Sequence, residues 1–276
     1  MKVNRIKRSR SHMTLAIFAL VVVVAIIVGI VLGFNTLKAI YLERCIVTDM
    51  SEQVIINSGK LVKPDIIAEN MGLKKGVNLA LLDFKRKREE LLRRIPNLRS
   101  VTITRQLPDK VFITCEEREP IARLGVHGRK TETGKVVDYE GVVFFCQRGT
   151  RMLPIIRESP TRLTAPGMQL SGRARAALRI LDACRTGELQ ELGILDADTS
   201  YSDYILCTLG DSYSQAKIAW EEMDEDTPAT KASLERQLTM LLKAVRASVG
   251  ARVVIWNATD TSHPGRIYAD TKGNMK

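Results

Sequence analysis

The side chains that most often do chemistry are sparse in this sequence. Its three histidines, His12, His127 and His263, lie far apart, and no HExxH, Walker A or GxSxG motif occurs. GLKKGVN (72–78) has two glycines, but it follows a short predicted helix, whereas a phosphate-binding loop follows a buried strand. The two acids of DYEG (138–141) fit a solvated hairpin turn better than a calcium site. We therefore predict no catalytic residue, no metal site and no cofactor.

The five cysteines, Cys45, Cys115, Cys146, Cys184 and Cys207, are widely spaced and odd in number, and they include no CxxC pair. This pattern does not support a zinc knuckle or a thioredoxin-type site. Free cysteines are commonly small buried apolar residues, and we expect that role here. A Cys45–Cys115 disulfide in an oxidising compartment is the alternative.

The net charge is +11, and five of the 42 basic residues lie within the first fourteen positions. The surplus over the rest of the chain is mild, so we predict no nucleic-acid partner. The largest local surplus is KRKREELLRR (85–94), which fits the solvated face of a helix with Phe84, Leu91, Leu92 and Ile95 on its apolar side. A surface for phosphate or lipid headgroups is the alternative.

Residues 15–34 form a charge-free apolar stretch of twenty residues. As a helix it covers about 30 Å, which matches the hydrocarbon core of a bilayer. A cleaved signal peptide is the alternative, but its apolar region is about 7–15 residues long, and NTLKAIYLERC offers no cleavage site. Since basic residues precede the stretch, we predict a cytoplasmic tail (1–14) and an exported remainder. The expected protein is single-pass, held by residues 15–34 in the lipid bilayer of the cytoplasmic (inner) membrane.

Beyond the apolar stretch the hydrophobic pattern predicts an α+β fold with two domains and a polar, flexible tail (258–276). In the first domain (41–118) a β-α-α-β-β order is expected after a strand at 41–49, with elements at 52–57, 64–72, 83–95, 100–105 and 110–117. In the second domain (119–257) we expect helices at 172–186 and 231–249, and strands at 135–138, 142–145, 152–156, 204–209, 214–220 and 251–257.

This order, together with GLKKGVNLALLD (72–83) and LLRRIPNLRSVTITRQLPDKVFITCEEREPIA (91–122), resembles the FtsQ/DivIB family of bacterial cell-division proteins. The resemblance implies that 41–118 is a POTRA domain and that 119–257 is a mixed α/β "β domain" with a multi-stranded, mostly antiparallel sheet. The residues that match the family signature, which we interpret as structural, are Pro96, Arg105, Pro108, Glu117, Arg118 and Pro120. The family's hairpin pattern resembles Asp138, Gly141 and Phe144. The family usually places a glycine soon after its leucine-proline pair; here MLPII departs from that pattern, which leaves the strand register of 150–200 open.

The resemblance further implies a non-enzymatic divisome scaffold that links early and late cell-division proteins for septum formation. Its partners would be FtsB- and FtsL-like membrane proteins, with FtsK-, FtsW- and FtsI-like proteins as further candidates. The partner-binding residues implied by segment order are Arg252, Val253, Val254, Ile255 and Trp256 of the last predicted strand, with Leu234, Arg236 and Gln237 of the helix before it. Alternation places Val253 and Ile255 on one face and Val254 and Trp256 on the other, and the sequence does not decide which face is buried.

Two other functions fit parts of the sequence. A POTRA-type membrane-anchored protein that assists export or assembly of other polypeptides usually carries several such modules, and this chain shows one. An anchored enzyme acting on the cell wall requires a catalytic pair that the sequence does not show.

Overall fold

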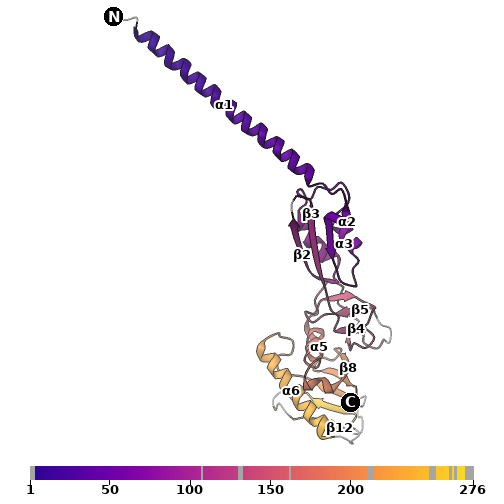
Figure 1. The fold of residues 1–276 in the computed structure, drawn as a ribbon. Helices are drawn as coiled ribbons and strands as arrows, with labels where there is room; N and C mark the ends of the chain where they lie inside the picture. Colours follow the sequence, from indigo (N-terminus) through magenta and orange to yellow (C-terminus); the bar gives the residue numbers. More distant parts are fainter. Residues whose placement is uncertain are drawn as a thin grey trace. The chain divides into compact units, whose positions relative to one another are not determined.

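The computed structural model describes residues 4–106, 108–129, 133–161, 163–210, 214–248, 253–260, 263 and 266–270, with side chains described from residue 18 onward. The chain forms two compact units (Figure 1). The first comprises Met1–Ser58, Lys63–Glu89 and Val101–Cys115. The second comprises Gly59–Val62, Glu90–Ser100 and Glu116–Lys276.

A single long helix, α1 (Asn4–Arg44), begins the first unit. The part from Phe18 to Arg44 is long and apolar enough to cross a membrane, and its side chains are exposed, as expected for a segment that lipid would surround. The predicted strand at 41–49 is wrong, because α1 continues to Arg44 and Ile46 forms only an isolated bridge with Asn78. Between Phe34 and Arg44 there is no glycine or proline to stop the helix, and leucine, alanine, glutamate and arginine favour it.

A three-stranded sheet with strand order β1-β3-β2 follows α1 and the short helix α2 (Met50–Gln53). Its elements are β1 (Val54–Asn57), α3 (Pro64–Met71), α4 (Phe84–Arg94), β2 (Leu98–Gln106) and β3 (Lys110–Glu117). The central strand β3 pairs in parallel with β1, which requires the long crossover that α3 and α4 provide. Gly72 ends α3 in the left-handed conformation with φ +71°. The predicted β-α-α-β-β order is confirmed.

The second unit contains, within the described residues, a nine-stranded sheet of order β12-β11-β10-β9-β8-β7-β4-β5-β6. Its strands are β4 (Ala122–Val126), β5 (Lys135–Val137), β6 (Val143–Phe145), β7 (Ile155–Glu158), β8 (Ile194–Asp198), β9 (Ile205–Leu209), β10 (Gln215–Ile218), β11 (Ile255–Ala258) and β12 (Tyr268–Asp270). Most neighbours are antiparallel; β4–β7, β7–β8 and β10–β11 are parallel. The predicted mostly antiparallel sheet and α+β class are confirmed.

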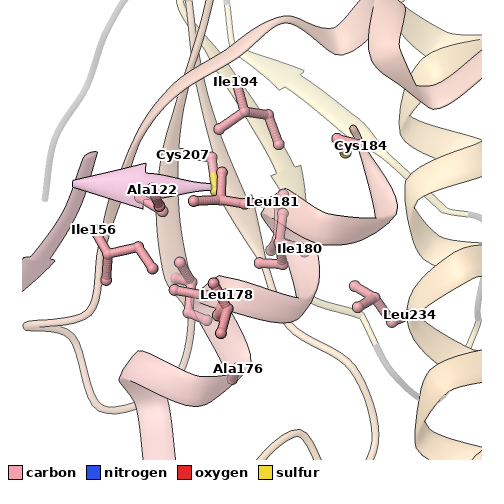
Figure 2. Packing of buried hydrophobic residues seen from close by; sticks show 14 of the residues in the cluster. Ala122, Ile156, Ala176, Leu178, Ile180, Leu181, Cys184, Ile194, Cys207 and Leu234 are labelled. Atoms are coloured by element: carbon pink, nitrogen blue, oxygen red, sulfur yellow. The ribbon is translucent and has the colours of Figure 1, made fainter. Parts of the chain in front are cut away.

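Two helices and a short 3-10 turn accompany this sheet: α5 (Gly172–Ala183), η1 (Glu188–Leu192) and α6 (Pro228–Ala247). Alanine and leucine recur on one side of α5 and are buried in the main core of the unit. Figure 2 shows Leu178, Ile180 and Leu181 of α5 in this core, with Ile156 of β7 and Leu234 of α6 among the other residues that form it.

All five cysteines are buried as thiols, so the expected burial is confirmed and the Cys45–Cys115 disulfide is not formed. Burial raises the pKa of the Cys184 thiol to about 12 and that of Cys207 well above its usual value. Because the thiolate is the reactive species, these raised pKa values disfavour reaction at the two side chains.

Several predicted boundaries in the second unit are corrected. The helix expected at 231–249 begins earlier, at Pro228, because Thr227 and Thr230 form a reciprocal cap there. The strand expected at 152–156 is β7, displaced toward Glu158, and β4 and β8 were not predicted. The last strand is not 251–257: β11 is followed by β12, which lies inside the predicted flexible tail.

Candidate functional site at the edge of the nine-stranded sheet

The two edges of the nine-stranded sheet are β12 and β6. On its inner side β12 pairs with β11 in antiparallel register, with Ile255 opposite Asp270 and Asn257 opposite Tyr268. On its outer side no strand pairs with β12 in the part of the chain that the structure describes. Tyr268 has 56% of its surface exposed on this strand. An edge of this kind can accept an added strand from another chain through main-chain hydrogen bonds.

The opposite edge is covered by the protein's own chain. The main-chain N–H of Val143 on β6 donates to Met168 O at 2.9 Å, and its carbonyl accepts from Gly167 N at 2.7 Å. The Asn97 side chain also donates to Phe145 O at 2.8 Å. Of the two edges, β12 is therefore the one better suited to strand addition.

The predicted partner strand lies one position inside this edge. β11 is paired on both sides, with β10 and with β12, so its main chain is already used within the protein. Ile255 and Trp256 are both buried, and Trp256 belongs to the main core. Val254 is the exposed member of the predicted set, with 41% of its surface accessible, and Val253 is partly buried. Arg252 lies outside the described residues.

The helix α6 supplies the other predicted partner residues, and they do not form one surface. Leu234 is buried in the core, and Gln237 is buried with its Nε2 donating to Ala258 O at 2.7 Å. This hydrogen bond ties α6 to β11, so Gln237 has a structural role. Arg236 is exposed, with Nε donating to Ala232 O within its own helix at 3.3 Å. Among the three, only Arg236 has an exposed side chain.

The signature residue Glu117, at the end of β3, binds a turn of main chain. Its carboxylate accepts from the N–H groups of Lys60 at 2.8 Å, Leu61 at 2.8 Å and Val62 at 2.7 Å. A Cβ placed on Gly59 would overlap the Glu117 carboxylate, so the close approach requires glycine there. Glu117 therefore holds the segment that leads into α3.

The next signature residue, Arg118, joins three groups within the second unit. Its Nη1 lies 2.5 Å from Asp138 Oδ2 and 2.8 Å from Glu140 Oε2, and its Nε donates to Pro96 O at 3.1 Å. Asp138 is completely buried, and its other oxygen accepts from Val142 N at 2.8 Å. These bonds place the predicted hairpin residue Asp138 against the signature residue Arg118.

The ion pairs of this cluster shift the pKa values of Arg118 and Glu140. Burial lowers the pKa of Arg118, but its hydrogen bonds to Asp138 and Glu140 outweigh that effect and the net pKa is raised. The hydrogen bond from Arg118 is the largest influence on Glu140 and lowers its pKa, burial opposes this, and Arg99 adds to the lowering. Both shifts favour the charged forms of Arg118 and Glu140.

The remaining signature residues lie elsewhere. Arg105, on β2, places its guanidinium carbon 4.4 Å from the centre of the Phe84 ring and donates to Leu82 O at 3.3 Å. Pro108 forms the turn between β2 and β3. Pro120 stands between the end of β3 at Glu117 and the start of β4 at Ala122, and it has no N–H group to donate to a strand ladder.

One side-chain pair with catalytic types was not predicted from the sequence. His127 Nδ1 lies 2.5 Å from Asp198 Oδ2. A His–Asp contact of this kind is part of the catalytic triad of many hydrolases, in which a serine or cysteine is hydrogen-bonded to the other ring nitrogen. No such nucleophile is hydrogen-bonded to His127 among the described residues, and those residues contain no group of three or more metal-ligating side chains.

Residues 51–118 match the family described as POTRA domain, FtsQ-type. A comparison with curated proteins gave no match. The chain thus carries an FtsQ-type POTRA domain, and this finding supports the resemblance to the FtsQ/DivIB family.

Proposed function

We propose that this protein is a non-enzymatic, membrane-anchored scaffold of bacterial cell division that links early and late division proteins during septum formation. The observation that carries the proposal is the FtsQ-type POTRA domain at residues 51–118 directly after an apolar helix long enough to span a membrane. The same anchor and domain order fit a location at the cytoplasmic membrane, with the N-terminus in the cytoplasm and the two units outside.

The proposed partner site is the outer edge of β12 together with the exposed residues beside it. An FtsB-like protein, accompanied by an FtsL-like protein, would add a strand next to Tyr268–Asp270. Among the predicted residues that the structure describes, those with exposed or partly exposed side chains are Val254, Arg236 and Val253. FtsK-, FtsW- and FtsI-like proteins are further candidates for other surfaces.

Depletion combined with imaging tests the function. A fluorescent fusion that replaces the native copy should gather at midcell, and its depletion should give long cells without septa. Uniform membrane fluorescence together with normal division after depletion would refute the scaffold proposal. Adding protease to intact spheroplasts tests the orientation, because an exported C-terminal part should be digested.

A further inference from the structure

The loop after α3 is joined directly to the end of the apolar helix. Within the first unit, Asn78 Nδ2 donates to Leu42 O at 2.7 Å, and Leu79 N donates to Cys45 O at 2.9 Å. Val47 exchanges two main-chain bonds with the same loop, donating to Val77 O and accepting from Gly76 N, both at 2.8 Å. These bonds fix the position of the loop relative to the last turn of α1.

The apolar surface of α1 extends almost to this junction. Leu37, Ile40 and Tyr41 are exposed on the helix beyond Phe34. Tyr41 is seven residues past Phe34, or about 10 Å along the helix, and the headgroup region adds about 5–7 Å to the hydrocarbon core on each side. Tilting of α1 shortens the distance between Tyr41 and the hydrocarbon core along the bilayer normal. Tyrosine is enriched at membrane–water interfaces. If α1 spans the bilayer, the loop bonded at Leu42 therefore lies close to the outer boundary of the headgroup region.

The side chains that the loop presents fit such a surface. Lys74 and Lys75 are exposed, and no acidic group is within ion-pair distance of either among the described residues. Leu81, a few residues further on, has 73% of its surface exposed, although its neighbour Leu79 is buried. Glu43 and Asp49 are also at this end of the unit. Hydrogen bonds from Ser51 are the largest influence that lowers the pKa of Asp49, and the nearby charge of Lys75 adds to the lowering. Two exposed lysines, neither of which forms a close ion pair among the described residues, and an exposed leucine on the same loop suit a layer of anionic headgroups over apolar chains.

We propose that residues 74–81 form a second membrane contact, in which Lys74 and Lys75 bind anionic lipid headgroups and Leu81 enters the interface. This contact holds the POTRA domain in one orientation on the membrane. It rests on the anchoring by α1 proposed above. The partner of this surface is the lipid bilayer, because the loop is hydrogen-bonded to the end of the helix that spans the bilayer.

Full-length protein in lipid nanodiscs provides the test. Since the native thiols are buried, a fluorophore on a Leu81→Cys variant labels one site. A nitroxide attached to the lipid headgroup should strongly quench the fluorescence of this label in discs that contain phosphatidylglycerol. A label on a Lys63→Cys variant, at the opposite end of α3, should stay bright.

Charge-changing substitutions test whether the two lysines are responsible for the membrane contact. Lys74→Glu with Lys75→Glu should abolish most of the quenching, since each lysine contributes about fivefold to such binding. Lys74→Arg with Lys75→Arg should preserve it, and 1 M salt should reduce it, because screening is then about 3 Å in range. An unquenched label at position 81, or quenching unchanged by the two glutamates, would overturn the proposal. Failure of the anchor itself would be seen separately, because the chain would not then co-elute with the discs.

Discussion

Arg118 and Asp138 form an ion pair in which Nη1 and Oδ2 are 2.5 Å apart, with Asp138 completely buried. The pair connects the end of β3 to the β5–β6 hairpin within the second unit. Both tryptophans of the chain, Trp220 and Trp256, are buried in this unit, so their fluorescence reports its unfolding.

Replacing Arg118 with alanine should lower the free energy of unfolding by about 3 kcal/mol, because a buried carboxylate loses its charged partner. Urea titration followed by tryptophan fluorescence measures this change. The matched control is Arg99→Ala, which breaks more exposed pairs with Glu116 and Glu140 and should cost less than about 1 kcal/mol. Equal losses in the two variants would show that burial of Asp138 does not determine the effect.

The same network predicts a pH dependence. Because the pKa of Glu140 is lowered in the folded protein, its contribution to stability is present above its usual pKa of about 4.5 and is lost as the pH falls through the lowered value. Wild type and Glu140→Gln should therefore differ in free energy of unfolding at pH 7, and the difference should shrink at pH 3–4. A difference that stays constant with pH would contradict the ion-pair interpretation.

Glu117→Ala should destabilise the protein by about 2 kcal/mol, since three main-chain N–H groups of residues 60–62 lose a charged acceptor. Glu116→Ala is the neighbouring control: its side chain is 55% exposed, and its removal should change stability by less than about 1 kcal/mol. Hydrogen exchange at residues 60–62 adds a local measurement, because exchange there should accelerate only in the Glu117 variant.

The two polar residues predicted on α6 should behave in opposite ways. Gln237→Leu should cost about 1 kcal/mol of stability, because Ala258 O retains a second donor, Ala219 N at 3.1 Å. It should leave partner binding intact. Arg236→Glu should leave stability unchanged and weaken the complex with an FtsB-like partner. Thermal unfolding and co-purification of the two variants measure both effects, and the reverse result would mean that α6 is assigned wrongly.

The elements found from sequence are those with a strong local pattern. Val111, Ile113 and Cys115 alternate on β3, and Gly72 marks the end of α3; the structure confirms both. β12 has three residues, too few to show a period, and its pairing with β11 depends on contacts that no local pattern carries.

The contacts of the predicted site residues could not be read from the sequence for a related reason. The role of Glu117 comes from main-chain groups 55 to 57 residues away, and that of Gln237 from a carbonyl 21 residues away. Alternation predicted opposite faces for Ile255 and Trp256 but not which face is buried; both residues are buried, and only Trp256 belongs to the main core.

Site-specific photo-crosslinking in living cells tests whether a partner strand adds to the β12 edge. A benzoylphenylalanine at Tyr268, 56% exposed on β12, should crosslink to an FtsB-like protein. The same group at Phe145, 55% exposed on β6 at the opposite edge of the sheet, should not. Crosslinking from Phe145 with none from Tyr268 would contradict the account.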